Sequence, residues 1–231
     1  MSIIAVSKGV LLFLSSTFFV FGLTPPNPPP KDKSSIYKGG LFERTFKFLV
    51  STLLAFWGSI ALLTNGPSQH NKIVSKICFH PSSSSFHNLA QLSLPFLLGT
   101  IALLLGSIIR LWCFRILGRL FTYEVSIQPE HKLITSGPYG IVRHPGYTGL
   151  VAMFAGAVIV CLSPGSYIRE CNLMATNAKW IISSWLFAAV FTTISLGRRG
   201  KIEDLALEKS FGQVWREYSE RVSYRFIPYL I

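Results

Sequence analysis

The chain has 231 residues, of which 50% are hydrophobic and only 14% are charged, and its mean hydropathy is +0.44. About a quarter of the residues in soluble domains are charged, so these values exclude an ordinary water-soluble domain. The apolar content also excludes a disordered chain, and the 18 glycines and 13 prolines show no collagen period. The sequence therefore predicts an integral membrane protein with room for one small catalytic or binding region.

Five apolar segments are long enough to be expected as membrane-spanning helices. They cover residues 10–23, extending back to Ile3, then 46–64, 89–109, 147–163 and 179–196. The first could instead be a cleaved signal peptide, but no small-x-small cleavage site precedes the next segment, so we expect a retained helix. The proline-rich residues 25–33 predict a stiff cytosolic linker, and the last two spans predict a helical hairpin.

The net charge of +12 comes from 22 basic and 10 acidic residues. Placing the connecting segments on alternate sides of the membrane puts 17 Lys and Arg residues on one side and 5 on the other. Cytosolic loops of membrane proteins carry such an excess. This distribution predicts an external N-terminus and a cytosolic C-terminus, and it removes the support for a nucleic-acid partner.

The four cysteines are Cys78, Cys113, Cys161 and Cys171. They form no CxxC pair and have no histidine at ligand spacing, so we expect no metal site. Cys161 and Cys171 flank one loop and could form a disulfide if that loop is lumenal.

Two cytosolic segments, 110–146 and 197–231, are long enough to carry function. The first contains EHKLITSGPYGIVRHPGYTG at 130–149, with turn formers at Gly137-Pro138 and His144-Pro145-Gly146. Taken singly, Arg143, Tyr139 and Tyr147 are typical of an interfacial belt. Taken together, these residues beside a membrane mouth favour a ligand cradle.

The second segment has the helical spacing of an amphipathic helix that lies on the bilayer. Its apolar positions are Leu207, Phe211, Val214, Trp215, Tyr218 and Val222. Arg199 and Glu203 are four residues apart and therefore share one helix face. They could form an ordinary exposed pair, or they could hold opposite charges of two different ligands.

These residues carry a family resemblance over about the last 110 positions. The stretch HKLITSGPYGIVRHPGYTG, two close spans, R-x-x-x-E, L-x-x-x-FG-x-x-W-x-x-Y-x-x-RV and a late Pro228 follow in order. Together they resemble isoprenylcysteine carboxyl methyltransferases. The resemblance implies an all-α integral membrane protein with about five transmembrane helices and a cytosolic C-terminal amphipathic helical cap that forms the cofactor site. Residues 1–109 would be N-terminal transmembrane helices, and 110–231 the methyltransferase core, with a cofactor loop (121–146), a helical hairpin (147–196) and the cap (197–231).

The resemblance further implies a multi-pass enzyme of the endoplasmic reticulum membrane in the processing of prenylated CaaX proteins. It would methylate the C-terminal carboxylate of a prenylated cysteine with S-adenosylmethionine. The implied cofactor contacts are His131, Lys132, Leu133, Ile134, Tyr139, His144, Pro145, Gly146, Tyr147 and Glu203, with Glu124 as a looser match. Arg199 would meet the substrate carboxylate, with Arg143 as a second substrate contact, and Arg199 and Glu203 would be the catalytic pair.

The chemistry agrees with these residue types, because a carboxylate is already ionised at neutral pH and needs no general base. The enzyme must supply in-line placement in a site that excludes water. Three alternatives remain at this point. A phospholipid amine N-methyltransferase would need a base for its acceptor. An NADPH-dependent sterol reductase has a similar tail to WREYSERVSYRFIPYLI, and a non-enzymatic membrane scaffold would use the same aromatic and basic residues only at the interface.

Overall fold

The computed structural model describes residues 3–24, 26–27, 78, 88–89, 91–121 and 132–229, and every regular element within them is helical. The long helices are α1 (Ile3–Leu23), α5 (Leu94–Leu117), α6 (Pro145–Leu162) and α8 (Ala178–Phe211). The short elements are η1 (Gly118–Leu120), η2 (Gly137–Gly140), α7 (Tyr167–Glu170), η3 (Leu173–Ala175) and α9 (Gln213–Arg221). The predicted second span and most of the proline-rich linker lie outside the described residues.

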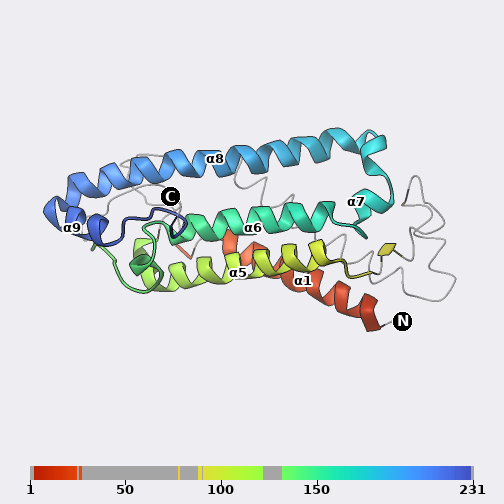
Figure 1. Cartoon of the computed structure of the whole chain (residues 1–231), viewed down its shortest axis with the longest axis horizontal. Helices are drawn as coiled ribbons and strands as arrows, with labels where there is room; N and C mark the ends of the chain where they lie inside the picture. The colour runs from red at the N-terminus through yellow and green to blue at the C-terminus, as the bar shows by residue number, and fades with distance from the viewer. Residues whose placement is uncertain are drawn as a thin grey trace.

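The four long helices run along the length of the molecule, with α8 beside α6 on the side away from α1 (Figure 1). Each contains a window long and apolar enough to cross a membrane. The spans lie within Val6–Leu23, Leu94–Leu120, Pro145–Glu170 and Ala178–Phe211. This part of the chain is therefore consistent with an all-helical integral membrane protein.

Helices α5 and α6 pack through glycines that bring their backbones into contact. A Cβ on Gly106 of α5 would lie 2.5 Å from the carbonyl oxygen of Gly149, and a Cβ on Gly156 of α6 would lie 2.5 Å from that of Gly99. Small residues permit such close approach in membranes, where packing rather than water exclusion drives helix association. The two helices therefore form a tight pair on which the other elements are placed.

Helix α1 joins this pair through a buried lysine. Lys8 is fully buried, and its ammonium donates to the carbonyl oxygens of Leu89 at 3.0 Å, Gln91 at 2.7 Å and Gly165 at 3.0 Å. A charge inside an apolar bundle must be met by such carbonyl dipoles or by a counter-charge. Lys8 thus ties α1 to the start of α5 and to the turn after α6.

The third predicted span, 89–109, is wrong at both ends. Ser93 caps α5 by accepting a hydrogen bond from the amide of Phe96, so the helix starts later than predicted. Arg110 does not end it, because its guanidinium is only 3% exposed and donates to the carbonyls of Gly22 and Gly146, the latter at 3.1 Å. A basic residue that is satisfied inside the protein is no stop signal, and α5 continues to Leu117.

The helix that contains the fifth predicted span, 179–196, does not end where the sequence predicts. Instead of stopping at Gly197, α8 runs without a break for 34 residues, roughly 51 Å at about 1.5 Å per residue. A bilayer core is about 30 Å thick, so the last turns of α8 extend beyond it. A glycine inside a helix costs only about 1 kcal/mol, so Gly197 does not by itself end α8.

The predicted amphipathic helix over 207–222 is split in two. Gly212 has a φ of 55°, a left-handed conformation that suits glycine, and it ends α8 and starts α9. The apolar face is nevertheless largely as predicted. Trp215, Tyr218 and Val222 are buried against the partly buried Leu133, Leu207 and Phe211. Val214 is the exception, with 60% of its surface exposed.

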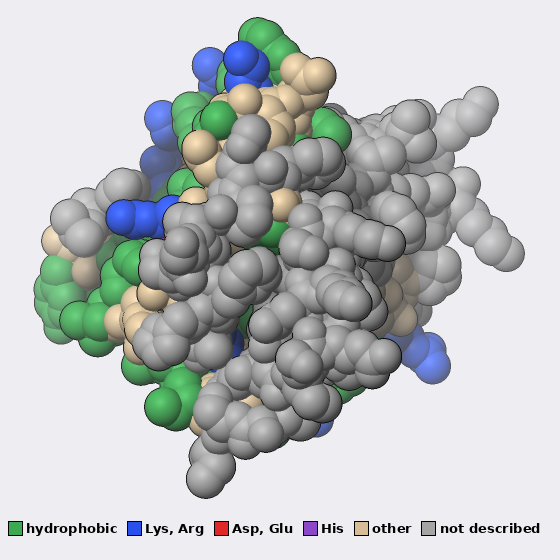
Figure 2. Space-filling model, turned by 90° about the vertical axis from the view of Figure 1, so that its right-hand side faces the viewer, with side chains coloured by type: hydrophobic (Ala, Val, Ile, Leu, Met, Phe, Trp, Pro, Cys, Tyr) green, Lys and Arg blue, Asp and Glu red, His purple; other side chains and the backbone are tan. Residues whose placement is uncertain are grey.

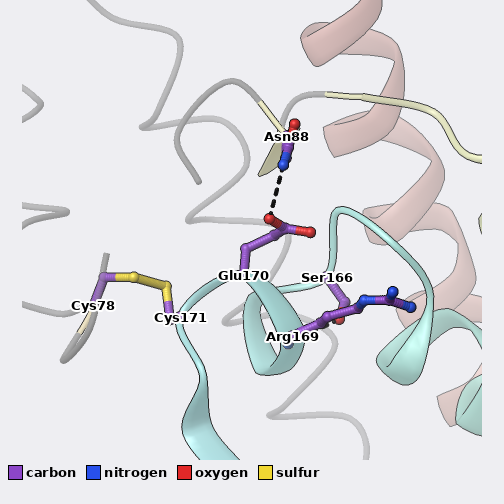
Figure 3. Close-up of a disulfide and its surroundings, with 6 residues drawn as sticks. All are labelled: Cys78, Asn88, Ser166, Arg169, Glu170 and Cys171. Carbon is purple, nitrogen blue, oxygen red and sulfur yellow. Dashed lines mark hydrogen bonds between the residues drawn. A yellow bond between two sulfur atoms is a disulfide. The ribbon is translucent and has the colours of Figure 1, made fainter. Parts of the chain in front are cut away.

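A disulfide lies at the end of the molecule that carries α7. It joins Cys171 to Cys78, not to Cys161, which is a free, buried cysteine within α6. Beside it Glu170 accepts hydrogen bonds from Asn88 at 3.1 Å and from the amide of Gly165 at 2.9 Å (Figure 3). In the view from this end, the visible coloured side chains are mainly hydrophobic or basic, and the rest of the coloured surface is uncharged side chains or backbone (Figure 2). The proposed Cys161–Cys171 bond is therefore incorrect, since Cys171 is paired across 93 residues.

Candidate functional site

Polar side chains gather at the opposite end, where the loop before α6, the middle of α8 and the C-terminal residues meet. In Figure 1 this is the end with α9, and the C-terminus lies beside the start of α6. We call residues 222–226, which follow α9, the C-terminal strap. The site has three parts: the turn that starts α6, one face of α8, and this strap.

The turn before α6 is shaped by glycine and proline. Gly137 has a φ of 61°, and a Cβ there would overlap the end of the Ile116 side chain of α5, so glycine is favoured at this position. His144 is the residue before the first helical turn, and Pro145 starts the helix, a position where proline loses no hydrogen bond. This geometry fixes His144 at the N-terminal end of α6, and Tyr147 follows in the first turn of the helix.

The C-terminal strap binds along this turn through its backbone. The amide of Arg143 donates to the carbonyl of Tyr224 at 2.9 Å, and the amide of His144 donates to that of Arg225 at 2.8 Å. The hydroxyl of Thr148 donates to the carbonyl of Phe226. The strap therefore satisfies backbone donors that precede a helix and would otherwise need water.

A buried carboxylate joins the strap and the turn to α8. Asp204 is 4% exposed. Its Oδ1 lies 2.8 Å from Nε2 of His144, and its Oδ2 lies 2.9 Å from Nε of Arg225 and 3.7 Å from the guanidinium of Arg143. Buried charges are stable only when paired in this way. Sequence reasoning did not select Asp204, Arg225 or Phe226 as functional; the available signal was the acidic pair Glu203-Asp204, whose members can lie on either side of one ring.

Glu203 lies on the other side of His144. Its Oε2 accepts a 2.6 Å hydrogen bond from the hydroxyl of Tyr147 and lies 3.7 Å from Nδ1 of His144. Its side chain is 32% exposed, and among the described residues its second oxygen accepts no hydrogen bond. One carboxylate oxygen of α8 is therefore free to meet a ligand.

Arg199 and Glu203 share one face of α8, as their spacing predicts. The guanidinium carbon of Arg199 lies 5.5 Å from the ring centre of Tyr147, the same ring whose hydroxyl binds Glu203. Arg199 is only 8% exposed. A buried cation and a partly exposed anion of α8 thus contact the same tyrosine.

Three aromatic rings form the wall between the turn and the strap. The rings of His144 and Tyr147 are stacked with centres 5.4 Å apart, and Phe226 lies 5.6 Å from His144 and 6.4 Å from Tyr147. Gly200 of α8 leaves room for Phe226, since a Cβ there would lie 2.6 Å from the Cζ atom of that ring. Helix α8 therefore approaches the rings closely only because residue 200 is glycine.

Helix α9 closes the outer side of the turn. Tyr218 donates a 2.8 Å hydrogen bond to the carbonyl of Tyr139 in η2. Burial raises the pKa of Tyr218 to about 12 and raises the pKa of Tyr139 well above its usual range. Both phenols therefore stay protonated near neutral pH. The predicted cap packs on the turn through Leu133 and these tyrosines.

Most of the residues predicted from the sequence are together at this end. Those brought together are Tyr139, Arg143, His144, Pro145, Gly146, Tyr147, Arg199 and Glu203. Leu133 packs against α9, whereas Lys132 is exposed and Ile134 is partly buried in the segment before η2. Glu124 and His131 lie outside the described residues.

The arrangement suits a ligand with both positive and negative groups at the edge of a membrane. Two buried donors, Nε of Arg143 and Nε1 of Trp215, have no hydrogen-bond partner in the described part of the chain. An open pocket of about 380 Å³ borders the same region and is lined by Lys201, Asp204, Leu205, Glu208, Trp215 and Arg225. Polar groups of this kind around a concave surface are typical of a binding site.

Asp204→Asn is expected to destabilise this end of the molecule, because the change leaves Arg225 and His144 without their buried counter-charge. Breaking a buried pair by removing one partner costs about 3–5 kcal/mol. The matched control is Glu208→Gln on the same helix, whose carboxylate pairs with the exposed Arg216 and should cost less than about 1 kcal/mol. Thermal unfolding in detergent measures both; equal melting temperatures would contradict the role given to Asp204.

Comparison with known proteins supports the resemblance over the core of the chain. The protein is 29% identical over 126 residues to a "Probable protein-S-isoprenylcysteine O-methyltransferase" of Oryza sativa subsp. indica, a match that covers 54% of this chain and 56% of the relative. It is 32% identical over 126 residues to "Protein-S-isoprenylcysteine O-methyltransferase B" of Arabidopsis thaliana, covering 54% and 55%. The chain thus spans little more than half the length of these relatives.

A different class of enzyme also shares this segment. A Delta(14)-sterol reductase of Mus musculus is 30% identical over 99 residues, which are 43% of this chain but only 20% of the reductase. No solved structure matches the chain. Residues 97–208, which include the turn from Arg143 to Tyr147 and the α8 face with Arg199 and Glu203, match the isoprenylcysteine carboxyl methyltransferase (ICMT) family.

Proposed function

We propose that the chain is a protein-S-isoprenylcysteine O-methyltransferase, which uses S-adenosylmethionine to methylate the C-terminal carboxylate of a prenylated cysteine. The observation that carries this proposal is that Arg199 and Glu203, one turn apart on α8, both contact Tyr147. These residues lie inside the segment that matches the family. The names of the plant relatives describe methyl transfer to a protein S-isoprenylcysteine, which supports the proposed acceptor.

The residues at this end fit S-adenosylmethionine, which has an ammonium, a carboxylate and a sulfonium. When bound, it supplies a methyl group on a positively charged sulfur. Glu203 offers an unused carboxylate oxygen for a cation, and the stacked rings of His144 and Tyr147 offer faces that attract positive charge. The unpartnered Nε1 of Trp215 offers a donor for an anion. Tyr139, Pro145 and Gly146 complete the proposed cofactor cradle.

Arg199 is the proposed contact for the substrate carboxylate. A C-terminal carboxyl group has a pKa of about 3.3–3.7 and is ionised at neutral pH, so the protein needs to orient it rather than deprotonate it. A guanidinium can hold one carboxylate oxygen by a charge-assisted hydrogen bond and leave the other exposed. Burial of Arg199 keeps water from competing. Arg143, which is bound to Asp204 and to the carbonyl of Ser223, is the proposed second contact.

Two other activities are less well supported by the same residues. An amine acceptor would need a neutral base, and the buried cation of Arg199 beside Tyr147 is a poor neighbour for a group that must lose a proton. A sterol reductase is favoured only by a match that covers one fifth of the mouse enzyme. Both remain outcomes of the experiment below.

We also propose that the site end faces the cytosol and the α7 end faces the lumen of the endoplasmic reticulum. The 17-to-5 division of basic residues supports this orientation. The Cys78–Cys171 bond supports it independently, because disulfides persist in oxidising compartments and are rare in the cytosol. The prenyl group would then enter from the bilayer, while S-adenosylmethionine arrives from the cytosol.

The reaction is tested with membranes that contain the full chain, labelled S-adenosylmethionine and a farnesylated cysteine derivative. We expect base-labile label on the prenylcysteine. Arg199→Gln should lower kcat/KM for that acceptor by about 10- to 100-fold, because a hydrogen bond to a charged group contributes about 1.5–3 kcal/mol. Arg198→Gln, which changes the exposed neighbour on α8, is the matched control and should retain activity.

Phosphatidylethanolamine and a sterol with NADPH serve as alternative substrates in parallel reactions. Label on the phospholipid, or reduction of the sterol without methyl transfer to prenylcysteine, would identify one of the other enzymes. Folded protein that acts on none of the three would favour a scaffold.

The orientation is tested with a membrane-impermeant maleimide on sealed microsomes. Lys209 is exposed on the last turns of α8, so a Lys209→Cys variant should react without detergent. The parent chain is the control, because Cys113 and Cys161 are buried and the other two cysteines form the disulfide. The disulfide cysteines of the parent chain should react only after both detergent and reductant are added. If Lys209→Cys reacts only after detergent is added, the proposed orientation is the reverse of the true one.

A further inference from the structure

We propose that the C-terminal strap is a positioning element of the methyl-transfer site, in which Phe226 holds the rings of His144 and Tyr147 in place. The proposal rests on the proposed function and deepens it. The strap follows residues 97–208, the range over which the family match extends, and no contact of the strap was part of the resemblance. It is assigned here from its contacts alone.

The strap is held to the turn by its backbone. Arg143, His144 and Thr148 each donate a hydrogen bond to a strap carbonyl, at Tyr224, Arg225 and Phe226 in that order. The register is therefore fixed residue by residue. A strap attached only by side chains could slide, whereas this pairing places the side chain of Phe226 at one position beside the start of α6.

The strap is also held to α8 by a charge. Arg225 donates to Oδ2 of Asp204 at 2.9 Å, and the other oxygen of the same carboxylate lies 2.8 Å from His144. Asp204 therefore links the position of the strap to the orientation of the His144 ring. The binding of Arg225 is part of the same network that orients the histidine.

Phe226 completes this network on its apolar side. Its ring contacts those of His144 and Tyr147, and the hydroxyl of Tyr147 binds Glu203. A shift of Phe226 would leave space beside both rings and loosen the hydrogen bond to Glu203. The effect should fall first on the cofactor contacts, since Phe226 contacts the rings of His144 and Tyr147 directly and reaches Arg199 only through Tyr147.

Gly200 allows a test that changes no charged group. It lies four residues before Asp204 and therefore on the same face of α8. The methyl group of Gly200→Ala would overlap the ring of Phe226 and force it away. Gly197→Ala is a matched control in the same helix, because a Cβ at Gly197 meets nothing within 4 Å. Both changes give the same gain in helix propensity.

We expect Gly200→Ala to raise the KM for S-adenosylmethionine about tenfold or more, since small misplacements in an active site cost up to about 100-fold. The KM for the prenylcysteine should change less, and Gly197→Ala should match the wild type. The amount and melting temperature of each variant are measured in the same preparations. A merely structural role would lower the amount of active enzyme and leave both KM values unchanged.

A second variant tests whether the effect passes through Phe226. Phe226→Leu removes the ring atoms that the alanine methyl would meet, so Gly200→Ala should add little to the KM in that background. Such non-additivity is the signature of two residues in contact. The proposal is overturned if Gly200→Ala behaves as Gly197→Ala, or if its full effect persists with Phe226→Leu.

The two proposals fail in different ways. If the wild-type chain transfers no methyl group to prenylcysteine, the proposed function fails and the strap proposal falls with it. If the wild type is active and Gly200→Ala is unchanged in both KM values, the strap proposal alone fails.

Discussion

The carboxylate of Asp204 is the constraint on which the functional end of the molecule depends. An ionised carboxylate in an apolar surrounding is stable only with close, hydrogen-bonded partners. Asp204 has such partners in His144 and Arg225, which come from the turn before α6 and from the C-terminal strap. Because α8 contributes the carboxylate itself, three segments far apart in the sequence must meet at one point. The placement of Glu203 and Arg199 follows from that meeting.

A second buried charge fixes the ends of the membrane helices relative to one another on the side of the site. Arg110 of α5 binds the carbonyl of Gly146 in the first turn of α6 and the carbonyl of Gly22 near the end of α1. Arg110 stays level with Gly146, because close contacts at the glycines of α5 and α6 prevent the two helices from shifting along each other. Lys8 and the Cys78–Cys171 bond perform the equivalent task at the other end. Two buried cations thus hold the two ends of the bundle in register.

The apolar segments and the local site motifs could be predicted from the sequence, because both depend on neighbouring residues. Hydropathy located every described span, and the spacing of Arg199 and Glu203 placed them on one face. The ends of α5 and α8 could not be predicted, because a local pattern treats Arg110 and Gly197 as stop signals. Only tertiary contacts show that Arg110 is satisfied internally, and the cost of Gly197 inside a helix, about 1 kcal/mol, is too small to end α8.

The C-terminal strap and the disulfide could not be predicted, because both depend on contacts between residues far apart in the sequence. Tyr224, Arg225 and Phe226 bind mainly through backbone carbonyls, which carry no sequence signal. The pairing of Cys171 with Cys78 spans 93 residues, whereas the sequence favoured the partner nearest in the chain. The roles of Glu124 and His131 remain predictions.

The central claim is that the turn, the α8 face and the C-terminal strap form one ligand site. Hydrogen exchange of the full chain in detergent, with and without S-adenosylhomocysteine, tests it most directly. Residues 139–148, 199–204 and 222–226 should all exchange more slowly when the ligand is present. Protection confined to other parts of the chain, or a strap that exchanges at the same rate while the ligand is bound, would contradict the account.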